Sequence, residues 1–504
     1  MSDIRELQRR LGAVWSMNRP GGPPHVIVAL PSFSLGESIL SHYATRIPAL
    51  EHRYLLASLM LPRYERCEMV FVCSETPSTE VLEYYAGLAP ASRRTSCRER
   101  LRIVTVDDLG ARSVAEKLLD RPEALRRLRA EIGGRPAFIE PWNVTDHEVE
   151  VATRLDTPIN GTLPELWPLG YKGAGRRLFR QAGVPTPTGR EDVRTVDQVC
   201  AAIAAIRAER PGSLGVVIKH DDSGAGDGNL VVELCDVTGR RLTDAEIRAR
   251  VEAMPSWYRA DLALGGVVEE LITGAAASSP SVQLDISPYG DVTVLATHEQ
   301  VLGGPTHQIY SGCRFPANPA YSPDLAAYAL GIGRALAGLG VVGRLSADFV
   351  AVADAAGRWS LYALEINLRK GGTTHPYAAL RHLVPGRYQP GLGLWRAADG
   401  TSRCYASTDN LVDPAWLGLP PIDVIHALTE TGLQFDRRTG TGVVLHMLSC
   451  LAVDGRLGLT AIGRTSEHAQ HLYDETARMI ADLAQAYQPV YGSPTEPVRR
   501  KARR

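Results

Sequence analysis

Short apolar runs alternate with amphipathic segments along the first 160 residues. Residues 25–30, 69–73 and 102–106 have the continuous apolar character of buried strands, whereas 39–61 and 114–132 repeat apolar residues at helical spacing. This alternation is typical of an open α/β sheet. No G-x-G-x-x-G follows the first strand, so no dinucleotide site is predicted by motif. The loop at 31–36 is open to two interpretations, a simple turn or a substrate contact.

Near residue 160 the pattern changes to one dominated by short strands. A helix is expected from about Gly173 to Ala182, where Val-Pro-Thr-Pro at 184–187 ends it. Apolar runs within 215–235 predict a hairpin, and further strands are expected at 267–272, 282–286, 292–296, 347–352 and 359–366. A last α/β piece ends in a helix over 466–487. We therefore expect three domains, at 1–160, 161–405 and 406–504.

Composition and charge narrow the class of protein. The 504 residues are 44% hydrophobic and 22% charged with a net charge of −1, which is ordinary for a soluble globular protein and gives no field that attracts nucleic acid or membrane. No apolar stretch reaches the roughly 20 residues needed to span a bilayer. The eight cysteines are scattered without a C-x-x-C pair. We expect a cytoplasmic protein with reduced cysteines. A homodimer is the assembly that we consider for it.

Lysine is rare in this chain, and its positions are informative. Only five lysines stand among 55 basic residues, and three of them lie beside glycine-rich or carboxylate-rich motifs: Lys172, Lys219 and Lys370. A compact ammonium is a point charge suited to phosphate oxygens. Lys219 is followed by Ser-Gly-Ala-Gly-Asp-Gly at 223–228, whose backbone can approach a phosphate closely. An ordinary hairpin loop is the alternative, but the adjacent lysine favours ATP.

A second motif predicts a metal site. Asp348 and the pair Glu365 and Asn367 lie on two neighbouring predicted strands, and alternation of side chains places residues 365 and 367 on one face. If the strands pair, three oxygen donors meet, which suits Mg²⁺ with substrate phosphates. The alternative is a strand with polar residues facing solvent. Arg369 and Lys370 add positive charge, and a second glycine loop begins at Gly371.

Two further segments complete the candidate site. The acidic strand at 267–272 is placed to bind adenine, through Glu269, Glu270, Leu271 and Ile272. Arg314 is a candidate anion ligand, although a surface arginine is equally plausible in a chain so rich in arginine.

The order of these motifs resembles the ATP-grasp superfamily. The segment Arg-Arg-Leu-Phe-Arg-Gln-Ala-Gly-Val-Pro-Thr-Pro at 176–187 also resembles the stretch after the first ATP-grasp lysine. Nearly the whole chain is similar to the pheganomycin-type peptide ligases. The resemblance implies an N-terminal pre-ATP-grasp α/β domain, a central two-lobed ATP-grasp of α+β character and a small C-terminal α/β module. Its partners would be small carboxylic acid and amine or peptide substrates.

The resemblance also implies roles for individual residues. Phosphates would be bound by Lys172 and Lys219 and covered by the loop that includes Ser223, Gly224, Gly226 and Gly228. The adenine would lie against Glu269, Glu270, Leu271 and Ile272, and Mg²⁺ would be held by Asp348, Glu365 and Asn367. Arg369 would stabilise the transferred phosphoryl group. The chain departs from the family at Ser346, where many relatives have an arginine, and at 280–283, where many have a glutamate for the ribose. Arg314 is the candidate to replace the missing arginine.

The implied reaction has two steps. A substrate carboxylate attacks the γ-phosphorus of ATP, and an amine then attacks the resulting acyl phosphate. His375 is a candidate base for the amine. A ligase of small amino acids, a carboxylase that uses bicarbonate and a nucleotide-binding module without catalysis are the alternatives. The identities of the acid and the amine are not specified by the sequence.

Overall fold

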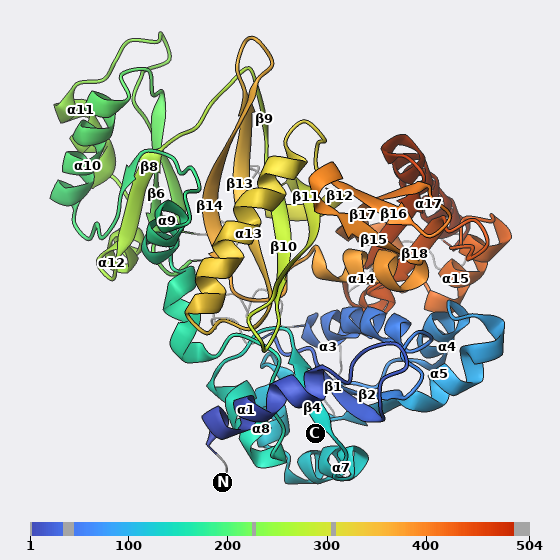
Figure 1. Cartoon of the computed structure of the whole chain (residues 1–504). Helices are drawn as coiled ribbons and strands as arrows, with labels where there is room; N and C mark the ends of the chain where they lie inside the picture. The colour runs from blue at the N-terminus through green and yellow to red at the C-terminus, as the bar shows by residue number, and fades with distance from the viewer. Residues whose placement is uncertain (1–2, 34–44, 224–227, 304–308, 488–504) are drawn as a thin grey trace, which may run out of the picture.

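The N-terminal segment folds into an α/β sheet, as predicted, and the structure shows that its strands are parallel. The computed structural model describes residues 3–33, 45–223, 228–303 and 309–487. In this domain, the four strands follow the order β3-β2-β1-β4 and are all parallel. The strands are β1 (His25–Leu30), β2 (Cys67–Cys73), β3 (Leu101–Thr105) and β4 (Ala137–Pro141). Figure 1 shows this domain at the base of the molecule, in blue to cyan.

Helices cover both faces of that sheet. Val26, Val28 and Val70 face one apolar core, whereas Ile27 and Ala29 face another that continues into the rest of the molecule. The predicted helix over 114–132 is interrupted, because Pro122 begins a new helix after Arg121. The helices are α1 (Ile4–Trp15), α3 (Ile47–Glu51), η1 (His52–Met60), α4 (Thr79–Gly87), η2 (Ala91–Arg93), α5 (Arg94–Arg100), α6 (Val114–Leu119), α7 (Pro122–Ile132) and α8 (Asp146–Leu155).

A small lobe follows, shown in green in Figure 1. Its antiparallel sheet has the order β5-β8-β6-β7, and the predicted hairpin is confirmed because Lys219 of β6 pairs with Asn229 of β7. Apolar side chains of these strands pack against the helices α10, α11 and α12 to form a separate core. The elements are η3 (Pro164–Gly170), α9 (Lys172–Gln181), β5 (Gly189–Arg190), α10 (Val196–Glu209), β6 (Gly215–His220), β7 (Asn229–Glu233), α11 (Asp244–Glu252), α12 (Ser256–Leu262) and β8 (Gly266–Glu270).

The rest of the chain is built on one eleven-stranded sheet. Its main path is β14-β13-β10-β11-β12-β17-β16-β15, and β9, β18 and β19 join it from the side. The first part comprises β9 (Ala276–Ser278), β10 (Pro280–Ile286), β11 (Val292–Gly303), β12 (Ile309–Phe315), α13 (Ser322–Gly338), β13 (Gly343–Ala353) and β14 (Trp359–Asn367). The helix α13 packs on one face of β10 and β11, which leaves the other face for the site.

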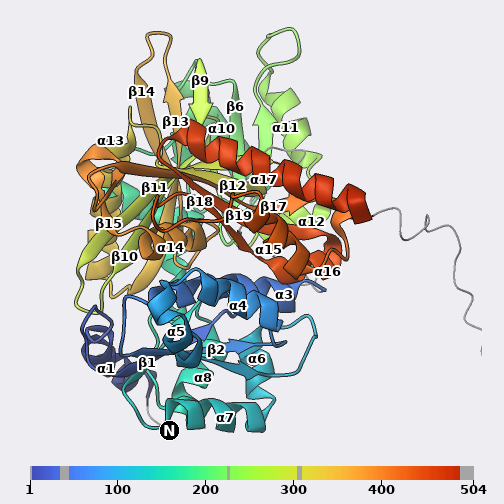
Figure 2. The same ribbon diagram turned by 90° about the vertical axis from the view of Figure 1, so that its right-hand side faces the viewer.

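The C-terminal elements extend this sheet instead of forming a detached unit. They are α14 (Thr374–Leu383), β15 (Gly386–Gln389), η4 (Pro390–Leu392), β16 (Leu394–Ala397), β17 (Ser402–Val412), η5 (Pro414–Trp416), α15 (Pro421–Glu430), β18 (Gly442–His446), η6 (Leu448–Cys450), α16 (Leu451–Asp454), β19 (Arg456–Gly463) and α17 (Ser466–Tyr487). Figure 2 shows α17 lying across the strands β17 and β19. The predicted domain limit between 405 and 406 falls within β17; the domain limits stay a prediction.

Candidate active site

Two carboxylates meet across neighbouring strands, as the sequence suggested. Asp348 of β13 lies directly opposite Glu365 of β14, and Asn367 lies opposite Ser346. The Asn367 amide nitrogen donates to the Asp348 carboxylate at 2.9 Å and lies 3.4 Å from Glu365. The intervening Leu345, Ala347 and Ile366 are buried in the core on the opposite face. Strand alternation therefore directs all three polar side chains to one face.

The electrostatics of this carboxylate pair are strained. Burial raises the pKa of Asp348, and the charge of Glu365 raises it further, to about 7. Burial acts in the same direction on Glu365, but the ammonium groups of Lys172 and Lys219 outweigh it and lower the pKa of Glu365 to about 2. Two close carboxylates that are largely removed from water cannot both ionise cheaply. A divalent cation would relieve this repulsion, so the three oxygen-bearing side chains fit Mg²⁺.

The two predicted phosphate lysines are brought to these carboxylates. Lys172 is the first residue of α9. Its ammonium group lies 2.7 Å from the Glu365 carboxylate and donates to the Ser223 carbonyl at 2.8 Å. Lys219 lies on β6 and forms an ion pair with Glu269 of β8. Both side chains are buried. The sequence thus places two ammonium groups beside the carboxylate pair, at the junction of the small lobe and the large sheet.

The acidic strand is confirmed as a strand, but Glu269 is held by basic groups. Glu269 is 2% exposed and accepts from Arg176 at 2.8 Å in addition to its ion pair with Lys219. Within the predicted adenine-binding segment, the N–H groups of Glu270 and Leu271 already donate to the carbonyls of Thr188 and Gly215. Contact of these two N–H groups with adenine would require those bonds to break. Glu269 orients Lys219 in this structure.

The remaining predicted residues have different positions. Burial lowers the pKa of Arg369, and the nearby charges of Glu365 and Asp348 oppose this effect. The Arg369 guanidinium also donates to the Lys370 carbonyl at 3.0 Å. Arg314 is not brought to these groups: it is exposed and donates to Gln470 of α17 at 3.2 Å. Its neighbours on β12, Cys313 and Phe315, are buried, so Arg314 faces the outer side of the sheet. Gly224 and Gly226 lie outside the described residues.

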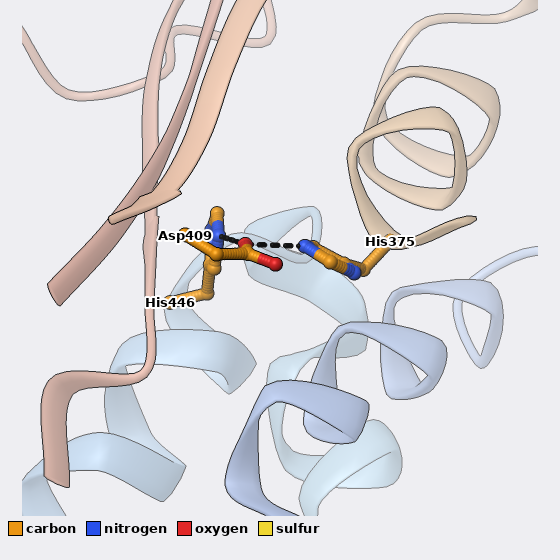
Figure 3. Close-up of side chains that lie close together, drawn as sticks. All are labelled: His375, Asp409 and His446. Atoms are coloured by element: carbon orange, nitrogen blue, oxygen red, sulfur yellow. Dashed lines mark hydrogen bonds and ion pairs between the residues drawn. The ribbon is translucent and has the colours of Figure 1, made fainter. Parts of the chain in front are cut away.

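A buried polar cluster next to this site was not predicted from the sequence. Asp409 of β17 accepts from His375 at 2.7 Å, from His446 at 2.8 Å and from Arg53 at 2.6 Å. Figure 3 shows the two imidazoles directed at the same carboxylate. The four residues come from η1, α14, β17 and β18, which are distant in sequence, so no local motif could predict the cluster.

This cluster has the side chains of a metal site but not its surroundings. One atom from each of His375, Asp409 and His446 lies within 4.8 Å of the others. The Arg53 guanidinium, which also lies 4.5 Å from the Trp142 ring centre, already supplies positive charge. Within the described part of the chain, the second ring nitrogens of both histidines have no hydrogen-bond partner, whereas metal-bound histidines usually have one. We interpret the cluster as a set of polar contacts that fixes the N-terminal domain against the large sheet.

Comparisons with known proteins agree with this geometry. A family model described as PGM1 C-terminal domain matches residues 423–476, and one described as IQCH-like, ATP-grasp matches residues 249–372. The L-propargylglycine–L-glutamate ligase of Streptantibioticus cattleyicolor is 32% identical over 380 residues, which cover 74% of this chain and 76% of that protein.

Two further likenesses are more distant. The IQ motif-containing protein H of Danio rerio is 24% identical over 345 residues, which cover 58% of this chain and 32% of that protein. Among solved structures, biotin carboxylase from Campylobacter jejuni, in complex with β-γ-ATP, aligns with a TM-score of 0.54 at 14% identity, over 92% of this chain and 95% of that one. At this identity the structural likeness shows the fold alone. No helix among the described residues is long and apolar enough to cross a membrane.

Proposed function

This chain belongs to the pheganomycin-type peptide ligases of the ATP-grasp superfamily, and we propose that it joins a nonproteinogenic amino acid, through its carboxylate, to the N-terminal amine of a peptide in the biosynthesis of a peptide antibiotic. The observation that carries the proposal is the cluster in which the buried Lys172 and Lys219 meet the partly buried pair Asp348 and Glu365. Such a cluster of opposite charges suits a nucleotide triphosphate and its cation.

The residues that we propose to hold Mg²⁺ are Asp348, Glu365 and Asn367. Their support is the strained carboxylate pair, since burial and mutual repulsion raise the pKa of Asp348 to about 7. A cation held there would neutralise phosphate charge. For Asn367 to act as a ligand, its amide oxygen would have to replace the nitrogen that now contacts Asp348.

The first step in the proposed mechanism is transfer of a phosphoryl group. A carboxylate oxygen of the donor substrate bonds to the γ-phosphorus of ATP, the bond from that phosphorus to the bridging oxygen breaks, and ADP leaves. Lys172 and Lys219 bind phosphate oxygens, and Arg369 stabilises the charge on the transferred group. Reactions of this type need placement and neutralisation of charge more than covalent help from the protein.

The second step forms the amide. The amine nitrogen of the acceptor attacks the carbonyl carbon of the acyl phosphate and loses a proton, and the carbon–oxygen bond to phosphate breaks. His375 is a proposed acceptor of this proton, because its ε nitrogen is fixed by Asp409 and its δ nitrogen has no partner in the described part of the chain. Against this role, burial lowers the pKa of His375 to about 3, which makes it a weak base before substrates bind. Exclusion of water protects the acyl phosphate from hydrolysis. We assign that task to the segment 223–228.

The alternatives predict different requirements. A ligase of small amino acids would use the same residues with a shorter acceptor. A carboxylase would need bicarbonate, and this alternative is compatible with the fold shared with biotin carboxylase. A binding module without catalysis would retain ATP affinity without turnover. Assembly as a homodimer stays a prediction.

The first experiment measures ADP release from Mg·ATP. L-propargylglycine and L-glutamate, which the name of the bacterial relative gives, form the first pair of substrates, followed by other nonproteinogenic acids and by peptides. The proposal expects release that requires both an acid and an amine, with the amide product identified by mass spectrometry. Release that requires bicarbonate instead, ATP binding without turnover across the panel, or turnover with free amino acids but with no peptide would overturn it.

A further inference from the structure

A cavity of about 240 Å³ lies between the N-terminal domain and the large sheet. Residues of β1, β4 and η1 form one wall, and the opposite wall comes from β10, β13 and α14. A single buried water needs only roughly 10–15 Å³ of such volume, so this cavity has room for a small organic molecule. Trp15, Trp142 and Met60 give it an apolar side.

The polar side of the cavity has more guanidinium groups than free carboxylates among the described residues. Four cationic side chains line it, but Lys370 is paired with Glu140 at 2.7 Å and Arg53 with Asp409 at 2.6 Å. In the described part of the chain, Arg344 and Arg381 form no direct ion pair, and the buried Nε of Arg344 has no hydrogen-bond partner. The one other carboxylate in the lining, Asp285, leaves an excess of positive charge beside the two guanidinium groups. A guanidinium is a fork-shaped donor that matches a carboxylate. The cavity is therefore suited to an anion.

The cavity and the carboxylate pair share one face of the sheet. Along β13, Arg344, Ser346 and Asp348 alternate with the core residues Leu345 and Ala347. The neighbouring strand β10 has the same arrangement, because Asp285 pairs with Arg344 and Ser281 pairs with Asp348. Four residues along a strand cover about 13 Å at 3.3–3.4 Å each. A ligand bound at Arg344 can thus extend towards the site of phosphoryl transfer.

An unpartnered amide lies between these two ends. Gln283 of β10 pairs with Ser346, midway between the cavity and the carboxylate pair, and only 1% of the residue is exposed. Neither amide atom of its side chain has a hydrogen-bond partner among the described residues. A buried amide without partners costs on the order of 1–3 kcal/mol. A polar ligand on this face would supply those partners.

The chemistry of the two substrates decides which of them the arginines hold. The carboxylate of the donor reacts at the γ-phosphate, so it must lie beside Lys172 and Asp348. The acceptor reacts through its amine, and its own carboxylate survives the reaction at a distance from that amine. We propose that the cavity is the acceptor site, in which Arg344 and Arg381 bind the free carboxylate of an amino acid or short peptide and Gln283 contacts its polar backbone. This inference rests on the proposed ligase function.

The test separates the two substrates kinetically. With L-glutamate as acceptor and the donor that supports turnover, Arg344→Gln is expected to raise the KM for L-glutamate by about ten- to a hundredfold, since a hydrogen bond to a charged group contributes roughly 1.5–3 kcal/mol. Arg381→Gln is a second, independent variant with the same expectation. The KM values for ATP and donor should not change. The matched control is Arg334→Gln, at an exposed arginine of α13 on the other side of the sheet.

Two further readouts make the test specific to the acceptor carboxylate. Hydroxylamine replaces the acceptor and traps the acyl phosphate as a hydroxamate, and its formation should persist in both cavity variants. The wild type should discriminate between L-glutamate and its two monoamides, and Arg344→Gln should discriminate less. An unchanged KM for L-glutamate, or an equal loss of hydroxamate formation, would overturn the proposal.

A binding measurement distinguishes failure of this inference from failure of the ligase function. Trp15 and Trp142 line the cavity, so L-glutamate should change the intrinsic fluorescence of the wild type and not of Arg344→Gln. Binding with this pattern but without turnover would retain the acceptor site and reject the ligase. Turnover with L-glutamate without this fluorescence change and without a KM effect would retain the ligase and reject the acceptor site.

Discussion

The Lys172 ammonium lies 2.7 Å from the Glu365 carboxylate, which joins the start of α9 to the end of β14. The same ammonium donates to the carbonyl of Ser223, at the edge of the glycine loop. Before phosphate arrives, Lys172 therefore neutralises a proposed metal ligand. Entry of ATP with its cation would exchange these partners, so that lysine contacts phosphate and carboxylate contacts metal.

Replacement of Glu365 tests this arrangement. Glu365→Gln removes the negative charge that holds Lys172 and is expected to lower the rate of ADP release at least about a hundredfold, the size of effect seen when one electrostatic stabiliser is removed from a phosphoryl or acyl transfer site. The measurement is ADP release at saturating ATP and substrates. Glu430→Gln, at an exposed position of α15, is the control and should retain activity. A Glu365→Gln rate within threefold of wild type would contradict the metal assignment.

Adjacent arginines in α9 offer a matched pair for stability. Arg176 is 2% exposed and donates to Glu269 and Glu191, whereas Arg177 forms an exposed pair with Asp192. Removal of one partner from a buried ion pair costs roughly 3–5 kcal/mol, and an exposed pair contributes less than about 1 kcal/mol. Because Lys219 remains beside Glu269, we expect Arg176→Ala to cost at least about 2 kcal/mol in the free energy of unfolding.

Denaturant unfolding of the two variants measures this difference in stability. Arg177→Ala should have a midpoint close to that of the wild type, whereas the midpoint of Arg176→Ala should fall clearly. Equal midpoints for the two variants would mean that the Arg176 network does not stabilise the small lobe. Arg176→Ala should also weaken ATP binding, since Glu269 would no longer be held in its position beside Lys219.

The sequence predicted those parts of the site that depend on local periodicity. The pairing of Asp348 with Glu365 follows from two adjacent strands with alternating side chains, and the hairpin after Lys219 follows from two apolar runs around a glycine loop. Both features need only the geometry of a strand and its nearest neighbour. The position of Arg314 could not be predicted in this way, because the sequence does not show which face of β12 is turned towards the site.

Features formed by distant segments were missed for a physical reason. Arg53 contacts Asp409, which lies 356 residues further along the chain, and Arg344 lines a cavity with Trp15 and Trp142. These contacts exist only after the N-terminal domain packs on the sheet, and no periodic pattern records that packing. The strand β17 was not predicted, and its place between β12 and β19, which are distant from it in sequence, is recorded by no local pattern.

Two adjacent glycines test the loop that follows Arg369. A Cβ added to Gly372 would lie 2.4 Å from an atom of the Tyr310 ring, whereas a Cβ added to Gly371 would meet no atom within 4 Å. Gly372→Ala is expected to shift the loop, with a cost of about 1–3 kcal/mol for overpacking and a reduced rate of ADP release through displacement of Arg369. Gly371→Ala should resemble the wild type in both thermal stability and rate. Identical behaviour of the two alanine variants would contradict this account of the loop.

Buried histidines should make the protein less stable in mild acid. Burial lowers the pKa of His298 to about 3, so the folded state keeps this imidazole neutral while the unfolded chain takes up a proton below pH 6.5. The unfolded state then binds more protons, and the free energy of unfolding falls as the pH decreases from 6.5 towards 3. At pH 5 the loss from one such group is about 2 kcal/mol, because 1.5 pH units correspond to that energy at 1.36 kcal/mol each.

Removal of this titration should flatten the pH dependence. His298→Gln replaces the imidazole with a neutral group that can still contact the Tyr405 hydroxyl, which lies 2.5 Å from the imidazole. Denaturant unfolding at pH 7 and pH 5 should show a smaller loss of stability in this variant than in the wild type, even if its stability at pH 7 is lower. His147→Gln, at an exposed position of α8, should keep the wild-type slope. Equal slopes for all three proteins would show that His298 is not held neutral by the fold; His375, whose pKa is lowered by burial to about 3 against the opposing charge of Asp409, would then be the next residue to replace.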